Sequence, residues 1–220
     1  MIKEAQAVLD FWFGENANDV VMGRDKLWFS DGSEVDLQIK KQFSSLVVDA
    51  KEQRLAHWEK NPKSHLALII LLDQFTRNIF RESAQAFSCD EQVRVICHQG
   101  LQQGFDRQLS VSERVFYYLP LEHSELIADQ QLCVRLLKQL ADKVEKRYAS
   151  RSEYRSIDED VDEHSNQYQK MFASYIEYAV LHHDIIAEYG RFPHRNRLLG
   201  RQSTEAELAY LKNDGHSFGQ

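Results

Sequence analysis

The stretch LALIILLDQFTRNIFR, residues 66–81, decides the interpretation of the fold, because its two halves differ in character. Residues 66–72 are all apolar, so a helix formed there has no polar side. Such a helix is buried on every side and belongs in the core of a globular protein. From Asp73 onward the same stretch becomes polar. We therefore expect a central helix that leads from the core into a polar cluster.

The polar half of this helix carries its hydrophilic side chains on one side. At about 100° per residue they share one arc, and Phe75, Ile79 and Phe80 take the remainder. The side chains on the arc are Asp73, Gln74, Arg77, Asn78 and Arg81. Polar groups that continue a buried segment must bond to one another or face water, because unpaired burial is costly. Two interpretations stay open: an Asp73–Arg77 pair with amide bonds that tie neighbouring helices together, or a ligand pocket.

Composition favours an all-α protein. The chain has 220 residues, of which 43% are hydrophobic and 28% charged, as is usual for globular proteins. Its 3 prolines and 9 glycines are too few for the many tight turns of a sandwich or barrel. No long run alternates β-branched with polar residues.

The apolar periodicity predicts a series of helices separated by short breaks, which usually makes neighbouring helices antiparallel. The expected helices are Ile2–Phe13, Glu34–Trp58, Pro62–Arg81, Ala84–Gln103, a short one from Ser110 or Ser112 to Tyr118, Glu122–Arg147, His164–Tyr189 and Thr204–Lys212. Together they form a single all-helical domain over residues 1–220. Residues 149–163, which include the acidic IDEDVDE, are predicted to be an exposed acidic loop or an insertion.

Charge and motifs exclude several classes of protein. A net charge of −7 argues against general binding to nucleic acid or to an anionic membrane. The apolar run at residues 66–72 is far shorter than the roughly 20 residues that span a bilayer, and the start is not a secretory signal. The 3 cysteines are predicted to be buried free thiols in a reducing cytoplasm. HExxH and paired CxxC motifs are missing, so we expect no metal and no cofactor.

A second polar cluster lies in YLPLEHSE, residues 118–125. On a helical projection Glu122 and His123 lie near Leu126, in the sector of Cys133 and Leu137, so we expect them to face inward near a helix start. The positive end of the helix dipole suits a carboxylate there. His123 is interpreted either as a neutral, hydrogen-bonded core residue or as a catalytic base.

The third cluster follows the last long helix. His182 projects into the apolar stripe of that helix, whereas Asp184 points outward. Residues 191–201 then contain four arginines and no acidic residue. Arginine suits carboxylate and phosphate groups because its guanidinium is a planar fork. These cations are either neutralised internally by Asp73, Glu122 or Glu125, or they form an anion pocket.

Together these stretches resemble a known family. VLDFWFG, ALIILLDQFTRNIFR, ERVFYYLPLEHSE and GRFPHRNRLLGRQST are similar to the bacterial proteins grouped as domain of unknown function 924. The similarity extends from Val8 to Leu211 and is least after Ala149, with Thr76 and Tyr189 as small departures. The resemblance implies an array of antiparallel helix pairs of the tetratricopeptide-like kind, and it implies no activity.

Three functions follow from the sequence. The first is a concave pocket for a small anion or a peptide carboxylate. Its predicted ligand-binding residues are Asp73, Gln74, Arg77, Asn78, Arg81, Glu122, His123, Arg191, His194, Arg195 and Asn196. The second is a hydrolase or phosphoryl-transfer enzyme, with His123 or His182 as base and Asp73 or Glu122 orienting it. The third is a scaffold for protein association, through aromatic residues at Trp12, Phe13, Trp28 and Phe29.

Overall fold

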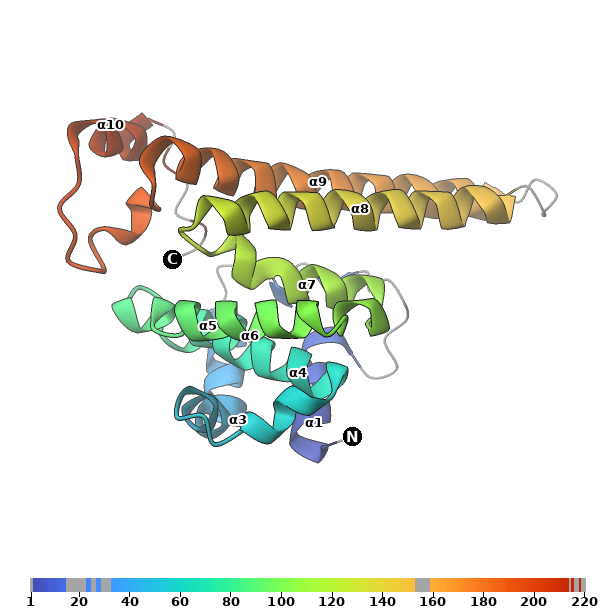
Figure 1. The fold of residues 1–220 in the computed structure, drawn as a ribbon, viewed down its shortest axis with the longest axis horizontal. Coiled ribbons are helices and arrows are strands. Elements are labelled where there is room, and N and C mark those ends of the chain that lie inside the picture. Colours follow the sequence, from blue (N-terminus) through green and yellow to red (C-terminus); the bar gives the residue numbers. More distant parts are fainter. Residues whose placement is uncertain are drawn as a thin grey trace. The chain divides into compact units, whose positions relative to one another are not determined.

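The computed structural model describes residues 2–14, 23–24, 27–28, 33–152, 159–213, 215 and 218. Every regular element in these ranges is a helix, which confirms the all-α prediction (Figure 1). The contacts divide the chain into two compact units, Met1–Pro120 with Phe192–Gln220 and Leu121–Arg191. We call them the first and the second unit. The single-domain and tetratricopeptide-like organisation stays a prediction.

The first unit is built from short helices around the apolar run at residues 66–72. Its α-helices are α1 (Lys3–Phe13), α3 (Ser33–Lys51), α4 (Pro62–Ile69), α5 (Thr76–Ile79), α6 (Asp90–Gln102), α7 (Val111–Glu122, which continues into the second unit) and α10 (Glu205–Asn213). Between α4 and α5 the chain forms a π-helical turn, Ile70–Phe75. Tighter 3₁₀ turns occur at Ala56–Lys60, Ala84–Phe87, Asp106–Gln108 and Pro193–Arg195.

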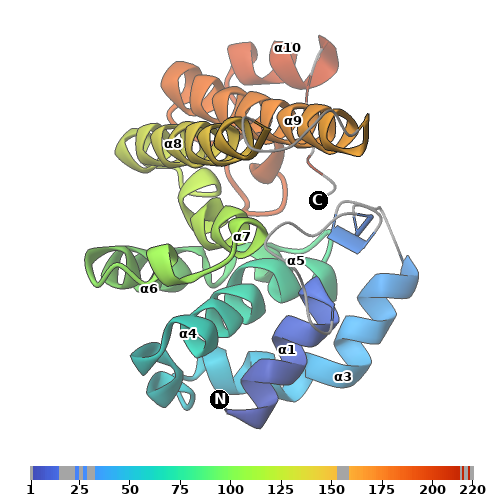
Figure 2. The same ribbon diagram turned by 90° about the vertical axis from the view of Figure 1, so that its right-hand side faces the viewer.

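The apolar run forms the centre of the core, as predicted. Each of its seven side chains is buried, and the run packs against α1 and α3 (Figure 2). Aromatic rings surround it. Trp12 meets Phe75 edge to face with the ring centroids 5.5 Å apart, and Trp28 meets Phe116 at 4.8 Å. Trp12, Phe13 and Trp28 are therefore core residues and not an association surface. Phe29 lies outside the described residues.

Several helix boundaries differ from the predicted ones. The helix predicted to reach Trp58 ends at Lys51, just before Gln53 takes a positive φ of 60°. The helix predicted over Ala84–Gln103 is a 3₁₀ turn followed by α6. Pro120 does not end α7, which continues through it to Glu122. Local turn chemistry thus overrides the apolar period in the first two cases, and the helix continues past proline in the third.

The second unit is an antiparallel hairpin of α8 (Ile127–Ser152) and α9 (Glu159–Tyr189), which lie side by side in Figure 1. Buried residues recur on each helix at alternating spacings of three and four, the spacing of a coiled-coil seam. On α8 they are Gln130, Cys133, Leu137, Leu140 and Val144, and on α9 Ala179, His182 and Ile186 continue from Phe172.

The two helices of the hairpin differ from the predicted ones: α8 begins and ends five residues later than Glu122–Arg147, and α9 begins five residues earlier than His164–Tyr189. The loop predicted over residues 149–163 is helical up to Ser152 and again from Glu159, and residues 153–158 lie outside the described part. Cys89, Cys97 and Cys133 are buried thiols that form no disulfide bond, as predicted. Among the described helices, none combines the length and the apolar character needed to cross a membrane.

Candidate functional site

Two arginines from distant parts of the chain share one carboxylate in the first unit. Arg77 Nη2 donates to Asp90 Oδ2 at 3.1 Å, and Arg195 Nη1 donates to the same oxygen at 2.9 Å. Arg77 Nη1 also donates to the backbone carbonyl of Asp73 at 2.8 Å and lies 3.5 Å from its Oδ1. We call Asp73, Arg77, Asp90 and Arg195 the Asp90 cluster. The predicted Asp73–Arg77 pair is thereby confirmed.

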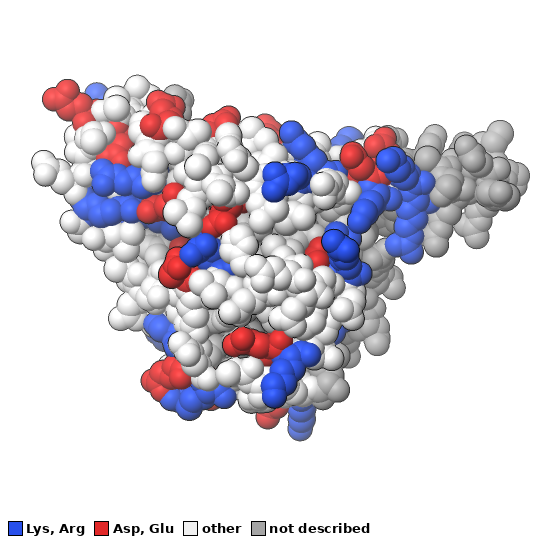
Figure 3. Space-filling model, in the orientation of Figure 1, with Lys and Arg blue, Asp and Glu red and all other residues white. Residues whose placement is uncertain are grey.

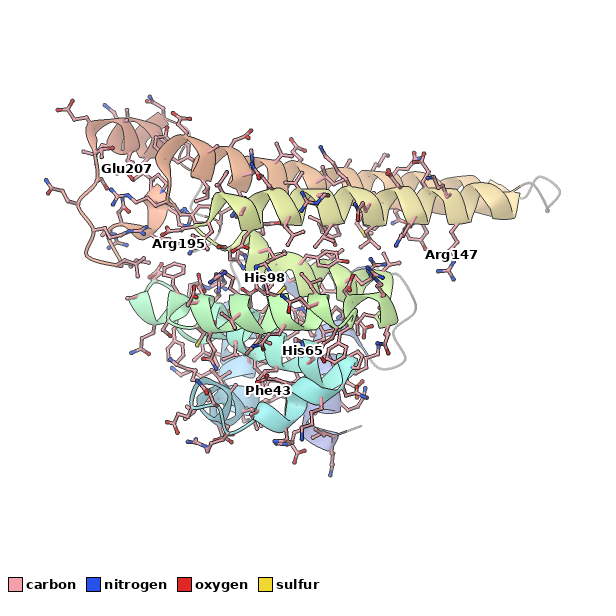
Figure 4. The ribbon with its side chains drawn as sticks, in the orientation of Figure 1. Phe43, His65, His98, Arg147, Arg195 and Glu207 are labelled. Carbon is pink, nitrogen blue, oxygen red and sulfur yellow. The ribbon has the colours of Figure 1, made fainter. Side chains whose placement is uncertain are left out.

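Three separate segments position the Asp90 cluster. Asp73 lies in the π-helical turn, where its carboxylate accepts a hydrogen bond from the side chain of Gln74. Turns of this kind are rare and occur frequently at functional sites. Asp90 is the first residue of α6, and Arg195 belongs to the 3₁₀ turn Pro193–Arg195 (Figure 4). The tertiary fold alone brings these segments together.

The charged side chains of the Asp90 cluster are largely buried. The Asp73 side chain is 0% exposed, those of Arg77 and Arg195 are 9% and 7% exposed, and that of Asp90 is 19% exposed. Burial alone would lower the pKa of Arg77, but the carboxylates of Asp90 and Asp73 outweigh it and raise that pKa. Arg77 therefore stays charged, and the two cations balance the two anions of the cluster.

Aromatic rings hold the guanidinium of Arg195 in place. Its Cζ lies 4.6 Å from the ring centroid of Phe87 and 4.4 Å from that of Phe192. Phe87 also lies 5.9 Å from Arg77 Cζ. Stacking of this kind fixes the plane of the fork, so the donors keep their direction toward the Asp90 oxygen.

The remaining polar residues of the 66–81 stretch bind a different carboxylate. Asn78 Nδ2 donates to Asp36 Oδ1 at 2.8 Å, and Arg81 Nε and Nη2 donate to the same carboxylate at 2.7 and 3.0 Å. The predicted arc is thus divided between Asp90 and Asp36. Sequence reasoning missed both carboxylates, because an acidic residue in the first turn of a helix is ordinary.

The segment that follows α9 is held by its own side chains. Asn196 Nδ2 donates to Ser203 Oγ at 3.0 Å, and Arg201 donates to Asn196 Oδ1 at 2.9 Å and to the Phe192 carbonyl at 3.0 Å. The ring of His194 packs against Phe192. Asn196 therefore shapes this segment. Arg195 pairs with the carboxylate of Asp90, a partner that the sequence reasoning did not name.

The second unit contains a histidine–carboxylate pair. His182 Nδ1 lies 3.5 Å from Glu122 Oε1 and 2.8 Å from the carbonyl of Tyr178. Because a carbonyl only accepts, the Nδ1 hydrogen is assigned to this bond, and Nε2 is then the basic nitrogen of the neutral ring. The Cys133 thiol lies 3.9 Å from Glu122 Oε2, and the rings of His123 and His182 are 6.3 Å apart.

Glu122 lies at the end of a helix and not, as predicted, at a start. It is the last residue of α7, and His123 follows in the turn before α8. The negative end of the helix dipole disfavours a carboxylate there, which is the opposite of the stabilising effect expected of a helix start. Gln130 Nε2 donates to the backbone carbonyl of Glu122 at 2.6 Å.

The other predicted site residues belong to one unit or the other. Arg191 is half-buried in the second unit, with Glu122, His123 and His182. Asp184 is exposed, as predicted, and pairs with the neighbouring His183 at 2.9 Å. Within the described part of the chain, no group of three or more His, Cys, Asp or Glu side chains is arranged to hold a metal ion.

Comparisons with known proteins agree with this architecture. A family model for bacterial proteins of unknown function, DUF924, matches residues 8–215. A solved structure of a protein of unknown function from Agrobacterium tumefaciens is 31% identical, with a TM-score of 0.74, over 95% of this chain and 97% of that one. No curated protein matches. Because the match extends over nearly the whole sequence, the chain belongs to this bacterial family of unknown function.

Proposed function

We propose that the protein binds a small ligand with a carboxylate or phosphate group at Arg77 and Arg195. The observation that carries this proposal is that both guanidiniums donate to one oxygen, Asp90 Oδ2, from segments far apart in the chain. Two arginines that converge on one anionic oxygen form the arrangement that recognises carboxylates and phosphates. Asp90 occupies that position as an internal anion.

The exposure of the cluster supports exchange of this anion. The Asp90 side chain is 19% exposed, more than either arginine, so Asp90 is the member of the cluster nearest to solvent, although its Oδ1 is buried. A ligand anion that replaces the Asp90 carboxylate accepts the same hydrogen bonds. The ligand anion then balances the charge of the two arginines in place of the Asp90 carboxylate, which turns toward water. A peptide carboxyl terminus and a phosphate monoester both meet this chemical requirement.

The proposal is tested by titrating the wild-type protein with phosphate, acetate and a short peptide, by calorimetry and thermal melting. We expect saturable binding that Arg195→Lys weakens, because lysine keeps the charge and loses the planar fork. Asp90→Asn removes the internal competitor, so it lowers the melting temperature without ligand and tightens binding. Added anion then restores stability by mass action.

The matched control is Asp49→Asn, which breaks the exposed Asp49–Arg54 pair, 2.5 Å apart, on the surface. This variant should show the same anion affinity as the wild type. If the wild type shows no saturable binding of any of these anions, the proposal is wrong and the Asp90 cluster has a purely structural role.

A second function, hydrolysis or phosphoryl transfer, is favoured by the His182–Glu122 pair. We infer that His182 serves as the general base through Nε2, while Glu122 and the Tyr178 carbonyl orient the ring through Nδ1. A panel of phosphate and carboxylate esters tests this function. His182→Gln should abolish any turnover, and the exposed His57→Gln should leave it unchanged. Absence of turnover on every ester removes this candidate.

A further inference from the structure

The α8–α9 hairpin carries a second stripe of residues beside its buried seam. On α8 the stripe is Val134, Lys138, Ala141 and Glu145, spaced by four, three and four residues. Lys138 and Glu145 are exposed, whereas Val134 and Ala141 are half-buried. Residues spaced in this way lie on one face of a helix, in the pattern of a helix-packing seam. We call this set the outer stripe of α8.

A similar stripe runs along α9. It consists of Gln169, Ala173, Ile176 and Val180, with the same spacings. Ala173 is exposed, and Ile176 and Val180 are half-buried. Two such stripes on one side of a hairpin form a face that a further pair of helices can cover, as in a four-helix bundle.

A cavity of about 250 Å³ opens between the two stripes. Its lining residues are Ala141, Val144, Glu145, Tyr168, Gln169, Phe172, Ala173 and Ile176. Phe172 and Val144 are buried, and the small side chains of Ala141 and Ala173 leave the space above them open. Small residues at these positions let another helix approach closely.

The charged residues of the outer stripe of α8 can pair with the same residues of a second copy. Lys138 lies three residues before Ala141, and Glu145 lies four residues after it. If a second copy of α8 crosses antiparallel about a two-fold axis between Ala141 and Asp142, Lys138 of each copy faces Glu145 of the other. A two-fold interface requires self-complementarity of this kind.

Mixed charge also distinguishes this face from a site for a strongly charged partner. Both basic and acidic side chains lie over the hairpin on the side drawn in Figure 3. Lys138 and Glu145 cancel each other within one stripe, so neither an acidic nor a basic partner gains net attraction there. A symmetric copy satisfies both charges at once.

We propose that the outer stripes and the cavity between them form a surface for self-association, and that its occupant is the hairpin of a second copy of this chain. Two hairpins then make a bundle of four helices, and side chains of each copy enter the cavity of the other. The proposal does not depend on the anion site, which lies in the first unit.

The test is a charge-swap series on the full chain, measured by sedimentation equilibrium and native mass spectrometry over a range of concentrations. We expect the wild type to dimerise. Lys138→Glu and Glu145→Lys each create two like-charge contacts and should weaken dimerisation about tenfold or more. The double variant Lys138→Glu with Glu145→Lys restores both pairs in reversed sense and should recover the wild-type dissociation constant.

Lys143→Glu is the matched control, because Lys143 is equally exposed but lies on another side of α8. It changes the net charge as much as Lys138→Glu does and should leave dimerisation unchanged. Circular dichroism confirms that each variant is folded. A wild type that stays monomeric overturns the proposal. A dimer whose dissociation constant is unchanged in the single variants also overturns the proposal. A double variant that fails to recover the wild-type dissociation constant does the same.

Discussion

Asp90 is the residue that accepts hydrogen bonds from both Arg77 and Arg195, and its local sequence does not distinguish it. CDEQ at residues 89–92 indicates an acidic first turn of a helix and nothing more. In the fold, the Asp90 carboxylate accepts hydrogen bonds from Arg77 and from Arg195. Arginine donors are recognisable in a sequence because they are conspicuous against an apolar pattern. Their acceptors are found only when the chain has folded.

His65 is a buried histidine that should make stability depend on pH. Its Nδ1 lies 3.0 Å from the Tyr117 hydroxyl, and burial lowers its pKa from 6.5 to about 4. The unfolded chain therefore takes up the proton first as the pH falls. The contribution of neutral His65 to the free energy of unfolding is present in full above pH 6.5. It decreases as the pH falls toward 4, by up to about 3 kcal/mol. Urea denaturation at several pH values measures this decline.

His65→Asn should flatten the pH dependence between pH 6.5 and 4, whatever its effect on stability at neutral pH. The exposed His57 provides the control, because His57→Asn should leave the slope unchanged. An unchanged slope in His65→Asn would assign the acid sensitivity to other groups.

Gly100 marks the closest packing between helices of the first unit. A Cβ at this position in α6 would lie 1.8 Å from the Tyr117 hydroxyl and 2.7 Å from His65 Cε1. Gly→Ala usually stabilises a helix, but here Gly100→Ala should cost about 1–3 kcal/mol because the site is already full. Chemical denaturation measures the loss. Gln102→Ala, on the exposed side of α6, should be nearly neutral.

At the scale of elements, helix boundaries were predicted most reliably where a side chain caps a backbone group only a few residues away. Ser110 or Ser112 was predicted to start one helix and Thr204 another, and Ser110 and Thr204 each form reciprocal hydrogen bonds with the glutamate three residues later. The boundary at Pro120 was wrong, because the helix continues through the proline. The π-helical turn at Ile70–Phe75 was not predicted from the sequence.

Thr204→Ala should destabilise the start of α10. The Thr204 hydroxyl accepts a hydrogen bond from Glu207 N at 3.2 Å, and the Glu207 carboxylate accepts one from Thr204 N at 2.7 Å. Loss of this cap should cost about 1 kcal/mol. Amide hydrogen exchange in α10 should accelerate accordingly, whereas Thr204→Ser should retain the wild-type rates. Equal rates in Thr204→Ala and the wild type would contradict the role of the cap.

At the scale of the whole molecule, the Asp90 cluster joins parts of the chain that are far apart in sequence. Arg77→Ala should cost about 3–5 kcal/mol, because it leaves the fully buried Asp73 carboxylate without its cation. Adding Asp73→Ala removes that buried charge, so the double variant should lose less than the sum of the single losses. A double-mutant cycle from urea denaturation should give a coupling energy above about 1 kcal/mol.

The exposed pair Arg54–Asp49 is the reference for this cycle. Its coupling energy should stay below about 0.5 kcal/mol, because solvent screens surface ion pairs. Coupling of equal size in the two cycles would mean that burial of Asp73 adds nothing to its interaction with Arg77.

The sequence alone determined the helical class, the membership in the family and the burial of residues 66–72, because these depend on composition, ordered motifs and local periodicity. It also identified the arginines and histidines that make up the polar clusters. Only the tertiary structure decided that Asp90 and Asp36 are their partners, and that His182 meets Glu122 at the end of a helix. An ion pair forms between groups that folding brings together, so its partners cannot be identified from local sequence.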